Sequence, residues 1–304
     1  VNTALSEKGL GSSELGNIAS LNIPYSAPVI VDPKKSFSLE NLVNRQMVSA
    51  GSGQYLTQTV RENMAAPVER GAAKPVSVYQ MESRNWELST IAHLSEPIAR
   101  QWLEDMSALT QFLSSELAYG LSEAVDSFIL NGGVSESGAT IPGILTAEDV
   151  EEIEFNTDPL RSIRRAIGSL DLAGIEATGI VMHPTAWEDI ENLSDTQGRT
   201  LLAPVGQAAN RRLWNVPVTL SAGIPEDQAI VADWSTIVLL DRGAIAIKAT
   251  ETSTATVGGD TPTTVSMFAH NLVQFRAEQR VGLTMLSLPS VRKVQLSEAT
   301  TPAP

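Results

Sequence analysis

The sequence contains no cysteine among its 304 residues. This absence excludes disulfide bonds, thiol catalysis, and zinc or iron–sulfur sites that depend on cysteine ligands. Any covalent reinforcement of the protein must therefore come from other chemistry. The sequence also lacks a run of about 18 apolar residues and a basic-then-apolar leader, so we expect neither a membrane-spanning segment nor a secretion signal.

Basic residues are few, since 21 Lys and Arg stand against 35 Asp and Glu, for a formal net charge of -14. Such a surface repels nucleic acid and anionic membranes unless cations are concentrated locally. The densest cationic runs, at 161–165 and 211–212, are short and interrupted. We therefore expect no membrane partner and only weak, non-specific contact with DNA. The 42% apolar content is enough for the core of a globular protein.

Two long segments near the start show little hydrophobic periodicity. Residues 1–40 are rich in Ser, Gly, Pro and Asn, and such an arm is ordered only when it packs on something else. A short helix is predicted within 38–48, and residues 49–80 then form an excursion with strand-like pieces at 55–60 and 76–81. Excursions of this length are uncommon in compact domains and usually serve a function.

The most regular pattern in the chain begins at residues 95–97 (SEP), which combine an N-cap candidate with proline near the first helical position. Apolar residues then recur every three or four positions, as on one face of a helix. This stripe comprises Ile98, Trp102, Met106, Leu109, Leu113, Leu117, Leu121, Val125 and Phe128. It ends at the stop signal NGG (131–133). The pattern predicts one helix of about 34 residues, about 50 Å long.

The remainder of the chain mixes short helices with short strands. A helix is predicted at 158–172 with Thr157 as its cap, and a buried strand at 179–182 leads into another helix that starts after His183. Residues 250–264 are rich in Thr and Gly and are expected to form a surface loop. Further regular segments are expected at 229–232, 236–240, 244–249, 265–281 and 283–288. The expected fold class is α+β.

Six stretches, taken together in their order and spacing, resemble a known family. They are TIAHLSEPIARQWLEDMSALTQFLSSELAYGLSEAVDSFILNG, IPGIL, GIVMHPTAWEDIENLSDTQGR, LWNVPVTLS, DWSTIVLLDRGAIAI and FAHNLVQFRAEQRVGLTMLSLPSV. In this arrangement the chain resembles the major capsid proteins of tailed bacteriophages with the Hong Kong 97 fold. The likeness extends from about Asn22 to Leu296.

The resemblance implies a division of the chain into named parts. These are an N-terminal arm (1–40), a short connecting helix (41–49), an extended loop (50–80), a peripheral domain with a long spine helix (81–140), an axial domain (141–257), and peripheral C-terminal strands with a tail (258–304). The cleavable N-terminal scaffolding segment that the family often carries is expected to have been removed or to be replaced by a separate scaffold.

The resemblance also implies a structural role rather than an enzymatic one. Copies of the chain would self-assemble into hexamers and pentamers of an icosahedral shell that encloses a double-stranded DNA genome. The implied partners are the chain itself, portal and scaffold or protease proteins, and a decoration protein. The implied location is the virion, which assembles in the cytoplasm of the bacterial host.

Crosslinking members of this family join subunits covalently. A lysine in the extended loop attacks an asparagine side chain of a neighbouring subunit, with a glutamate as the base, and an isopeptide bond and ammonia result. Alignment of residues 55–75 places the lysine on Lys74, within ERGAAKPV. Alignment at 278–280 (EQR) places the asparagine on Asn271 and the base on Glu278. The resemblance implies no cofactor and no metal.

The chemistry needs these residue types. A lysine amine is nucleophilic only when neutral, and with an ordinary pKa near 10.4 roughly one in 2,500 is neutral at pH 7. It must therefore be desolvated and given a base, beside an amide held at contact distance. The alternative is that Lys74 is a solvated loop lysine, that Asn271 only satisfies backbone groups, and that Glu278 pairs with Arg276 or Arg280.

Other groups of residues give weaker evidence for a function. His93, His183 and His270 are widely separated and lack HxxxH spacing, so we expect no metal site. The segment GLGSSELG (9–16) has the wrong spacing for a phosphate-binding loop. Four tryptophans are expected to fill cores, namely Trp102, Trp187, Trp214 and Trp234.

Two rival functions remain open at this point. An encapsulin-like compartment protein shares the fold but encloses an enzyme cargo, and the long arm and phage-type extended loop argue against it. A conventional soluble enzyme is the second rival. No catalytic cluster other than the self-directed one around Lys74 supports it.

Overall fold

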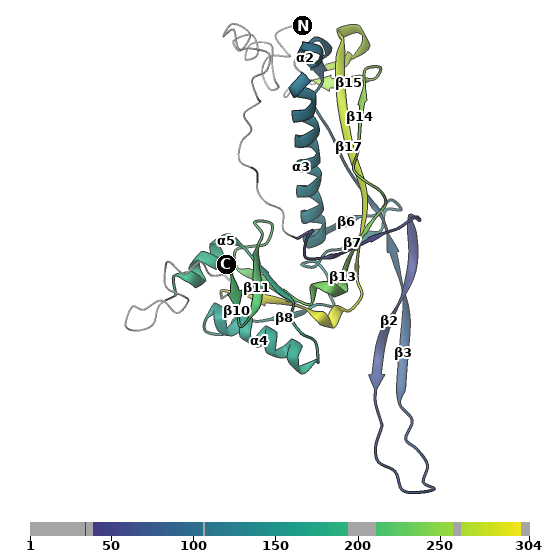
Figure 1. Ribbon diagram of the computed structural model, residues 1–304, viewed down its shortest axis with the longest axis vertical. Coiled ribbons are helices and arrows are strands. Elements are labelled where there is room, and N and C mark those ends of the chain that lie inside the picture. Colours follow the sequence, from purple (N-terminus) through teal and green to yellow (C-terminus); the bar gives the residue numbers. More distant parts are fainter. Residues whose placement is uncertain (1–33, 35–38, 106, 194–210, 258–262, 299–304) are drawn as a thin grey trace, which may run out of the picture. The chain divides into compact units, whose positions relative to one another are not determined.

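The computed structural model describes residues 34, 39–105, 107–193, 211–257 and 263–298 (Figure 1). The predicted arm at 1–40 thus lies outside the described residues, apart from Lys34, Leu39 and Glu40. The described chain divides into two compact units. The first unit is drawn from 90–125 and 243–280 together with Lys34, and the second from 39–89, 126–242 and 281–298.

The first unit is built on a long helix and the strands that pack on it. Its elements are β4 (Ser89–Leu94), β5 (Ile98–Ala99), α2 (Arg100–Asp105), α3 (Ser107–Asn131), β14 (Ala246–Thr250), β15 (Thr254–Val257), β16 (Thr263–Ser266), the 3-10 turn η2 (Phe268–His270) and β17 (Leu272–Met285). The boundary between the units falls within α3 and within β17.

One face of α3 forms the core of the first unit. Leu113, Leu117 and Leu121, each four residues apart, are buried against Phe275 and Ala277 of β17. This spacing keeps them on one side of the helix, and burial of each leucine contributes about 2 kcal/mol relative to exposure. The apolar stripe in the sequence is therefore the face that α3 turns toward β17.

The helical segment starts later than the sequence suggested. Residues 98 and 99 form β5, which pairs with Leu272 and Val273 of β17. Ser95, expected to cap the helix, instead donates its backbone N–H to the carbonyl of Phe275 at 2.8 Å. Pairing with β17 satisfies these backbone groups, so the helical segment begins at Arg100 with α2.

The segment 250–264, predicted as a loop, contains regular structure. β15 pairs with β16 in antiparallel register, from Thr254 opposite Ser266 to Val257 opposite Thr263. Threonine favours strands because its branched side chain suits a pleated surface, and the prediction gave too little weight to that preference.

The second unit contains a six-stranded mixed sheet in the order β10-β11-β9-β12-β18-β8. Its strands are β8 (Glu151–Ile153), β9 (Gly179–Met182), β10 (Arg212–Leu213), β11 (Val216–Leu220), β12 (Gln228–Ala232) and β18 (Val291–Gln295). Two helices, α4 (Pro159–Leu172) and α5 (Pro184–Glu191), share one buried cluster with this sheet. Ile180 and Met182 of β9 and Val231 of β12 belong to that cluster.

The residue that caps the N-terminus of α4 differs from the predicted one. Its cap is Asp158, whose Oδ1 accepts the backbone N–H of Arg161 at 2.8 Å, rather than Thr157. Thr157 has a positive φ of 65° and lies outside the helix. A carboxylate at this position satisfies a free backbone donor and favours the positive end of the helix dipole.

The prediction of a connecting helix at 41–49 is wrong. Residues 44–47 form β1 (Asn44–Met47), which runs parallel to β13 (Ile237–Asp241) from Asn44 opposite Val238 to Met47 opposite Asp241. Arg45 secures the pair, because its Nη2 lies 3.0 Å from Oδ2 of Asp241. A four-residue strand with every side chain exposed carries little pattern, so pairing with a distant strand decides its conformation.

An extended hairpin protrudes from the rest of the second unit (Figure 1). We use this name for β2 (Ser52–Glu62), β3 (Val78–Glu87) and the connection at 63–77. The strands pair from Ser52 opposite Glu87 to Glu62 opposite Val78, with one irregularity between Gln58 and Val60. A smaller hairpin, β6 (Gly132–Val134) and β7 (Thr140–Pro142), follows α3.

Two short 3-10 turns, η1 (Trp234–Thr236) and η3 (Leu288–Ser290), complete the second unit. Within the described ranges, no helix is both long enough and apolar enough to cross a membrane.

Candidate functional site

Lys74 lies in the connection of the extended hairpin. The chain turns at Arg70 and Gly71, where Gly71 has a φ of 92° and the N–H of Ala72 bonds to the carbonyl of Glu69. Lys74 follows three residues after Gly71 with its side chain exposed, and among the described residues its Nζ reaches only the carbonyl of Ala72, at 3.5 Å. The lysine is thus presented near the end of a protruding element.

Asn271 lies where η2 meets β17. Its φ of 52° and ψ of 48° are left-handed, a conformation that asparagine tolerates better than most residues. Its carbonyl accepts the backbone N–H of Arg100 at 2.9 Å. The side chain is exposed and forms no hydrogen bond with any residue that the structure describes. The amide carbon is therefore accessible from outside the unit.

Glu278 lies on β17 opposite Ala246 of β14. Its Oε2 is 3.2 Å from Nε of Arg276, two residues earlier on the same face, and its side chain is 30% exposed. This ion pair is the arrangement anticipated by the alternative interpretation. Exposed pairs of this kind contribute at most about 1 kcal/mol, so another cation or a desolvated amine can replace Arg276.

The three residues are divided between the two units of the chain. Lys74 belongs to the second unit, whereas Asn271 and Glu278 belong to the first. Asn271 immediately precedes β17 and Glu278 lies on it seven residues later, so at about 3.3 Å per residue their backbones are separated by about 23 Å. A single chain therefore cannot place Glu278 beside its own Asn271.

The three histidines form local hydrogen bonds within the fold. His93 Nε2 lies 2.9 Å from the carbonyl of Leu117, and His183 accepts the N–H of Thr185 as the cap of α5. His270 Nδ1 lies 2.9 Å from the carbonyl of Ser266. The part of the chain described here holds no group of three potential metal ligands.

The expectation for the tryptophans was wrong at one position. Trp187 and Trp234 are buried and Trp102 packs partly buried beside α3. Trp214 is 48% exposed with a φ of 46°, at a two-residue turn between β10 and β11. Apolar character alone does not reveal that a residue lies at a turn.

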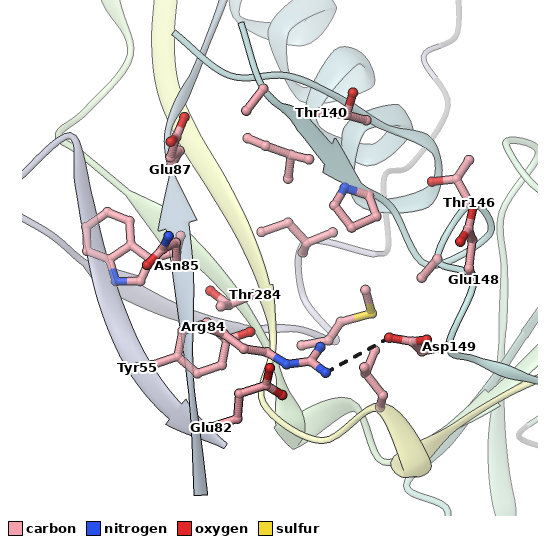
Figure 2. A pocket seen from close by; sticks show the side chains of 18 residues that line it. Tyr55, Glu82, Arg84, Asn85, Glu87, Thr140, Thr146, Glu148, Asp149 and Thr284 are labelled. Carbon is pink, nitrogen blue, oxygen red and sulfur yellow. Dashed lines mark ion pairs between the residues drawn. The ribbon is translucent and has the colours of Figure 1, made fainter. Parts of the chain in front are cut away.

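Sequence reasoning missed a groove of about 780 Å³ at the base of the extended hairpin (Figure 2). One wall carries Glu82, Arg84, Asn85 and Glu87, and the opposite wall carries Thr140, Thr146, Glu148 and Asp149. These segments are far apart in the sequence, and no motif joins them. The only signal was the acidic run at 148–154, which reads equally well as a solvated face.

Comparison with known proteins places these features in a family. The family model described as "Phage capsid family" matches residues 24–295. The chain belongs to the phage capsid family. The major capsid protein of Enterobacteria phage HK97 is 27% identical over 213 residues, which span 69% of this chain and 55% of that protein. The match thus covers about half the length of this capsid-family relative.

Solved structures of the capsid fold are also similar. The capsid of a native GTA particle superposes with a TM-score of 0.71 at 16% identity, over 95% of this chain and 100% of the other. A chain of Mycobacterium phage Adephagia gives 0.70 at 15% identity, over 95% and 98%. These likenesses confirm the expected α+β fold of the Hong Kong 97 type.

Proposed function

We propose that this chain is the major capsid protein of a tailed bacteriophage, and that its copies form the hexamers and pentamers of an icosahedral shell around double-stranded DNA. The observation that carries the proposal is the match of the capsid family model to residues 24–295. The formal charge of -14 suits a container, because a net-negative wall binds packed DNA weakly.

The shape of the second unit supports assembly. The extended hairpin presents large apolar side chains to solvent, including Leu56 at 70%, Val76 at 80% and Met81 at 68% exposure. Several large apolar side chains exposed on one element are consistent with an interaction site. In this proposal the extended hairpin is the extended loop of the shell protein, and these side chains become buried on neighbouring subunits.

We further propose that Lys74 forms an isopeptide bond with Asn271 of a neighbouring subunit. Neutral Nζ of Lys74 attacks Cγ of Asn271, the Cγ–Nδ2 bond breaks, and ammonia leaves. The carboxylate of Glu278 takes a proton from Nζ and returns it to the departing nitrogen. No oxidant, water or cofactor is consumed, and proximity lowers the barrier by several kcal/mol.

The separation of about 23 Å between Asn271 and Glu278 bears on how such a site is built. The carboxylate beside a given Asn271 has to come from a chain other than the one that supplies that asparagine. The bond therefore forms only after subunits have come together, which protects free chains from premature linkage.

Electron microscopy of particles from cells that express the chain with its assembly partners tests the shell. We expect closed icosahedral particles that hold nuclease-protected double-stranded DNA. Particles that enclose an enzyme and no DNA would indicate the encapsulin-like alternative, and a chain that stays monomeric under assembly conditions would contradict both.

A further inference from the structure

The groove at the base of the extended hairpin runs along strand edges. Four consecutive residues of β3, 84–87, line it, and so do the consecutive residues 139–142 of β7 and its approach. Side chains of a strand alternate between faces, so consecutive residues line a groove only when it follows the edge. Two strands thus border the groove edge-on.

Both edges are available for pairing. In the described part of the chain, β3 pairs with β2 and with no other strand, and β7 pairs with β6 alone. Unpaired strand edges offer rows of N–H and C=O groups and are templates for an added strand. Pro142, which has no N–H to donate, is consistent with β7 being an edge strand.

The floor of the groove holds a polar group that lacks a partner. Thr284 of β17 is only 6% exposed, and its Oγ1 makes no hydrogen bond within the described residues. It lies in the groove beside Arg84 (Figure 2). A buried hydroxyl without a hydrogen-bond partner is unfavourable, and a ligand that enters the groove and bonds to this hydroxyl removes the penalty. Trp86 and Leu288 add partly exposed apolar surface.

The rim of the groove is acidic. Glu82, Glu87, Glu148 and Asp149 face a single cation, Arg84, whose Nη2 is 4.0 Å from Oδ2 of Asp149. Ser135 and Ser137 donate hydrogen bonds to Glu87 and lower its pKa, which keeps its charge in place. The rim therefore favours a basic ligand over an acidic one.

We propose that this groove binds an extended, basic segment of another protein by strand addition, with apolar side chains alternating with lysine or arginine. A second copy of this chain is a poorer fit, because its formal charge of -14 opposes the acidic rim. The inference goes beyond the shell function, since the groove lies within one unit and binding can be measured on the unassembled chain.

Fluorescence anisotropy with defined peptides tests the proposal. The probe is a fluorescein-labelled Lys-Val-Lys-Val-Lys-Val peptide, added to the full chain at low salt. We expect saturable binding. The matched Glu-Val-Glu-Val-Glu-Val peptide should not bind. A Lys-Val peptide methylated on all of its internal backbone nitrogens keeps the charge but has no internal N–H to donate from either strand edge, and should bind about tenfold more weakly.

Two variants locate the binding. The double variant Glu148→Lys/Asp149→Lys should bind the Lys-Val peptide about tenfold more weakly than the unmodified chain. Glu188→Lys with Asp189→Lys changes the charge equally on the exposed side of α5 and should weaken binding far less. Thr284→Val, which removes only the hydroxyl, should weaken binding several-fold.

Several outcomes would count against the proposal. Equal binding of the methylated peptide would exclude strand addition, and equal effects of the two double variants would place the peptide elsewhere. Failure of the Lys-Val peptide to bind, together with self-association that Glu148→Lys/Asp149→Lys abolishes, would assign the groove to a second copy instead.

Discussion

Asn271 immediately precedes β17, and Glu278 lies on that strand about 23 Å further along the chain, at a rise of about 3.3 Å per residue. Asn271 ends η2 in a left-handed conformation, and Glu278 pairs with Arg276 further along β17. The electrophile and the base of the proposed crosslink are therefore contributed by different copies of the chain. This relationship makes the crosslink testable by mixing variants.

Co-assembly of two variants should limit the crosslinked product to a dimer. Lys74→Ala subunits retain the asparagine and Asn271→Ala subunits retain the lysine, so each chain can take part in one bond only. Denaturing electrophoresis of mixed particles should show a band near twice the 32.5 kDa of the monomer and nothing larger. Particles of either variant alone should give the monomer band.

An exposed lysine elsewhere serves as the control. Lys248→Ala alters an exposed lysine on β14 and should leave the ladder of the unmodified chain intact. A ladder that persists in Lys74→Ala particles would refute the assignment of the lysine.

Gly132 should be intolerant of a side chain. It has a φ of 73°, and an added Cβ would clash with the carbonyl of Ile141 in the β6–β7 hairpin. We expect Gly132→Ala to lower the free energy of unfolding by about 3 kcal/mol, measured by urea denaturation. Gly168→Ala, in open space on α4, should raise it by about 0.5–1 kcal/mol. Equal effects would show that backbone geometry at 132 is not the cause.

Glu40 should make stability depend on pH. Burial raises the pKa of its carboxyl; Arg45 opposes this shift, and Asp126 and Asp241 add to it. The folded state therefore binds the proton more tightly than the unfolded state. The contribution of Glu40 to the free energy of unfolding is present below about pH 4.5. It is lost as the pH rises through the higher pKa of the folded state.

Replacement by a neutral isostere should remove that loss. Glu40→Gln is expected to be more stable than the unmodified chain at pH 7, by about 1 kcal/mol at most because the site is partly solvated. The difference should shrink toward pH 4.5 in thermal unfolding across this range. Glu188→Gln, which removes the same charge from an exposed position on α5, is the matched control. A Glu40→Gln difference that grows on acidification would contradict the sign.

Trp214 should carry backbone strain. It and Asn215 both have positive φ values, 46° and 71°, as a two-residue turn of type I′ requires. Trp214→Asn should raise the free energy of unfolding by about 1 kcal/mol, because asparagine tolerates this conformation. Trp214→Ala keeps the Cβ and should not produce that gain. Chemical denaturation of both variants distinguishes relief of strain from loss of an exposed aromatic.

Elements with a strong local period were predictable. The apolar stripe of α3 recurs every three or four residues because that face is buried, and from Leu109 to Leu121 it packs with β17 in one cluster. The strand at 179–182 was predicted to the residue, since all four of its residues are buried. The helix expected at 41–49 and the loop expected at 250–264 were wrong because the conformations of β1 and β15 depend on pairing with a partner strand.

The candidate site also has a part that the sequence could predict and a part that it could not. Lys74, Asn271 and Glu278 were identified by alignment to a family, and the structure places the first on a protruding hairpin, the second just before β17 and the third on β17. The groove could not be predicted, because β3, β7 and β17 contribute to it from segments more than 40 residues apart.

The sequence by itself determined the family, the α+β class, the buried face of α3 and the types of residue available for a crosslink. These properties follow from local periodicity and from the order of segments, which need no knowledge of distant contacts. Only the tertiary structure decided that β1 is a strand, that Asn271 and Glu278 are too far apart to act within one chain, and that two strand edges flank Thr284. Each of these depends on which backbone groups remain unpaired after folding, and that outcome is set by pairings between distant parts of the chain.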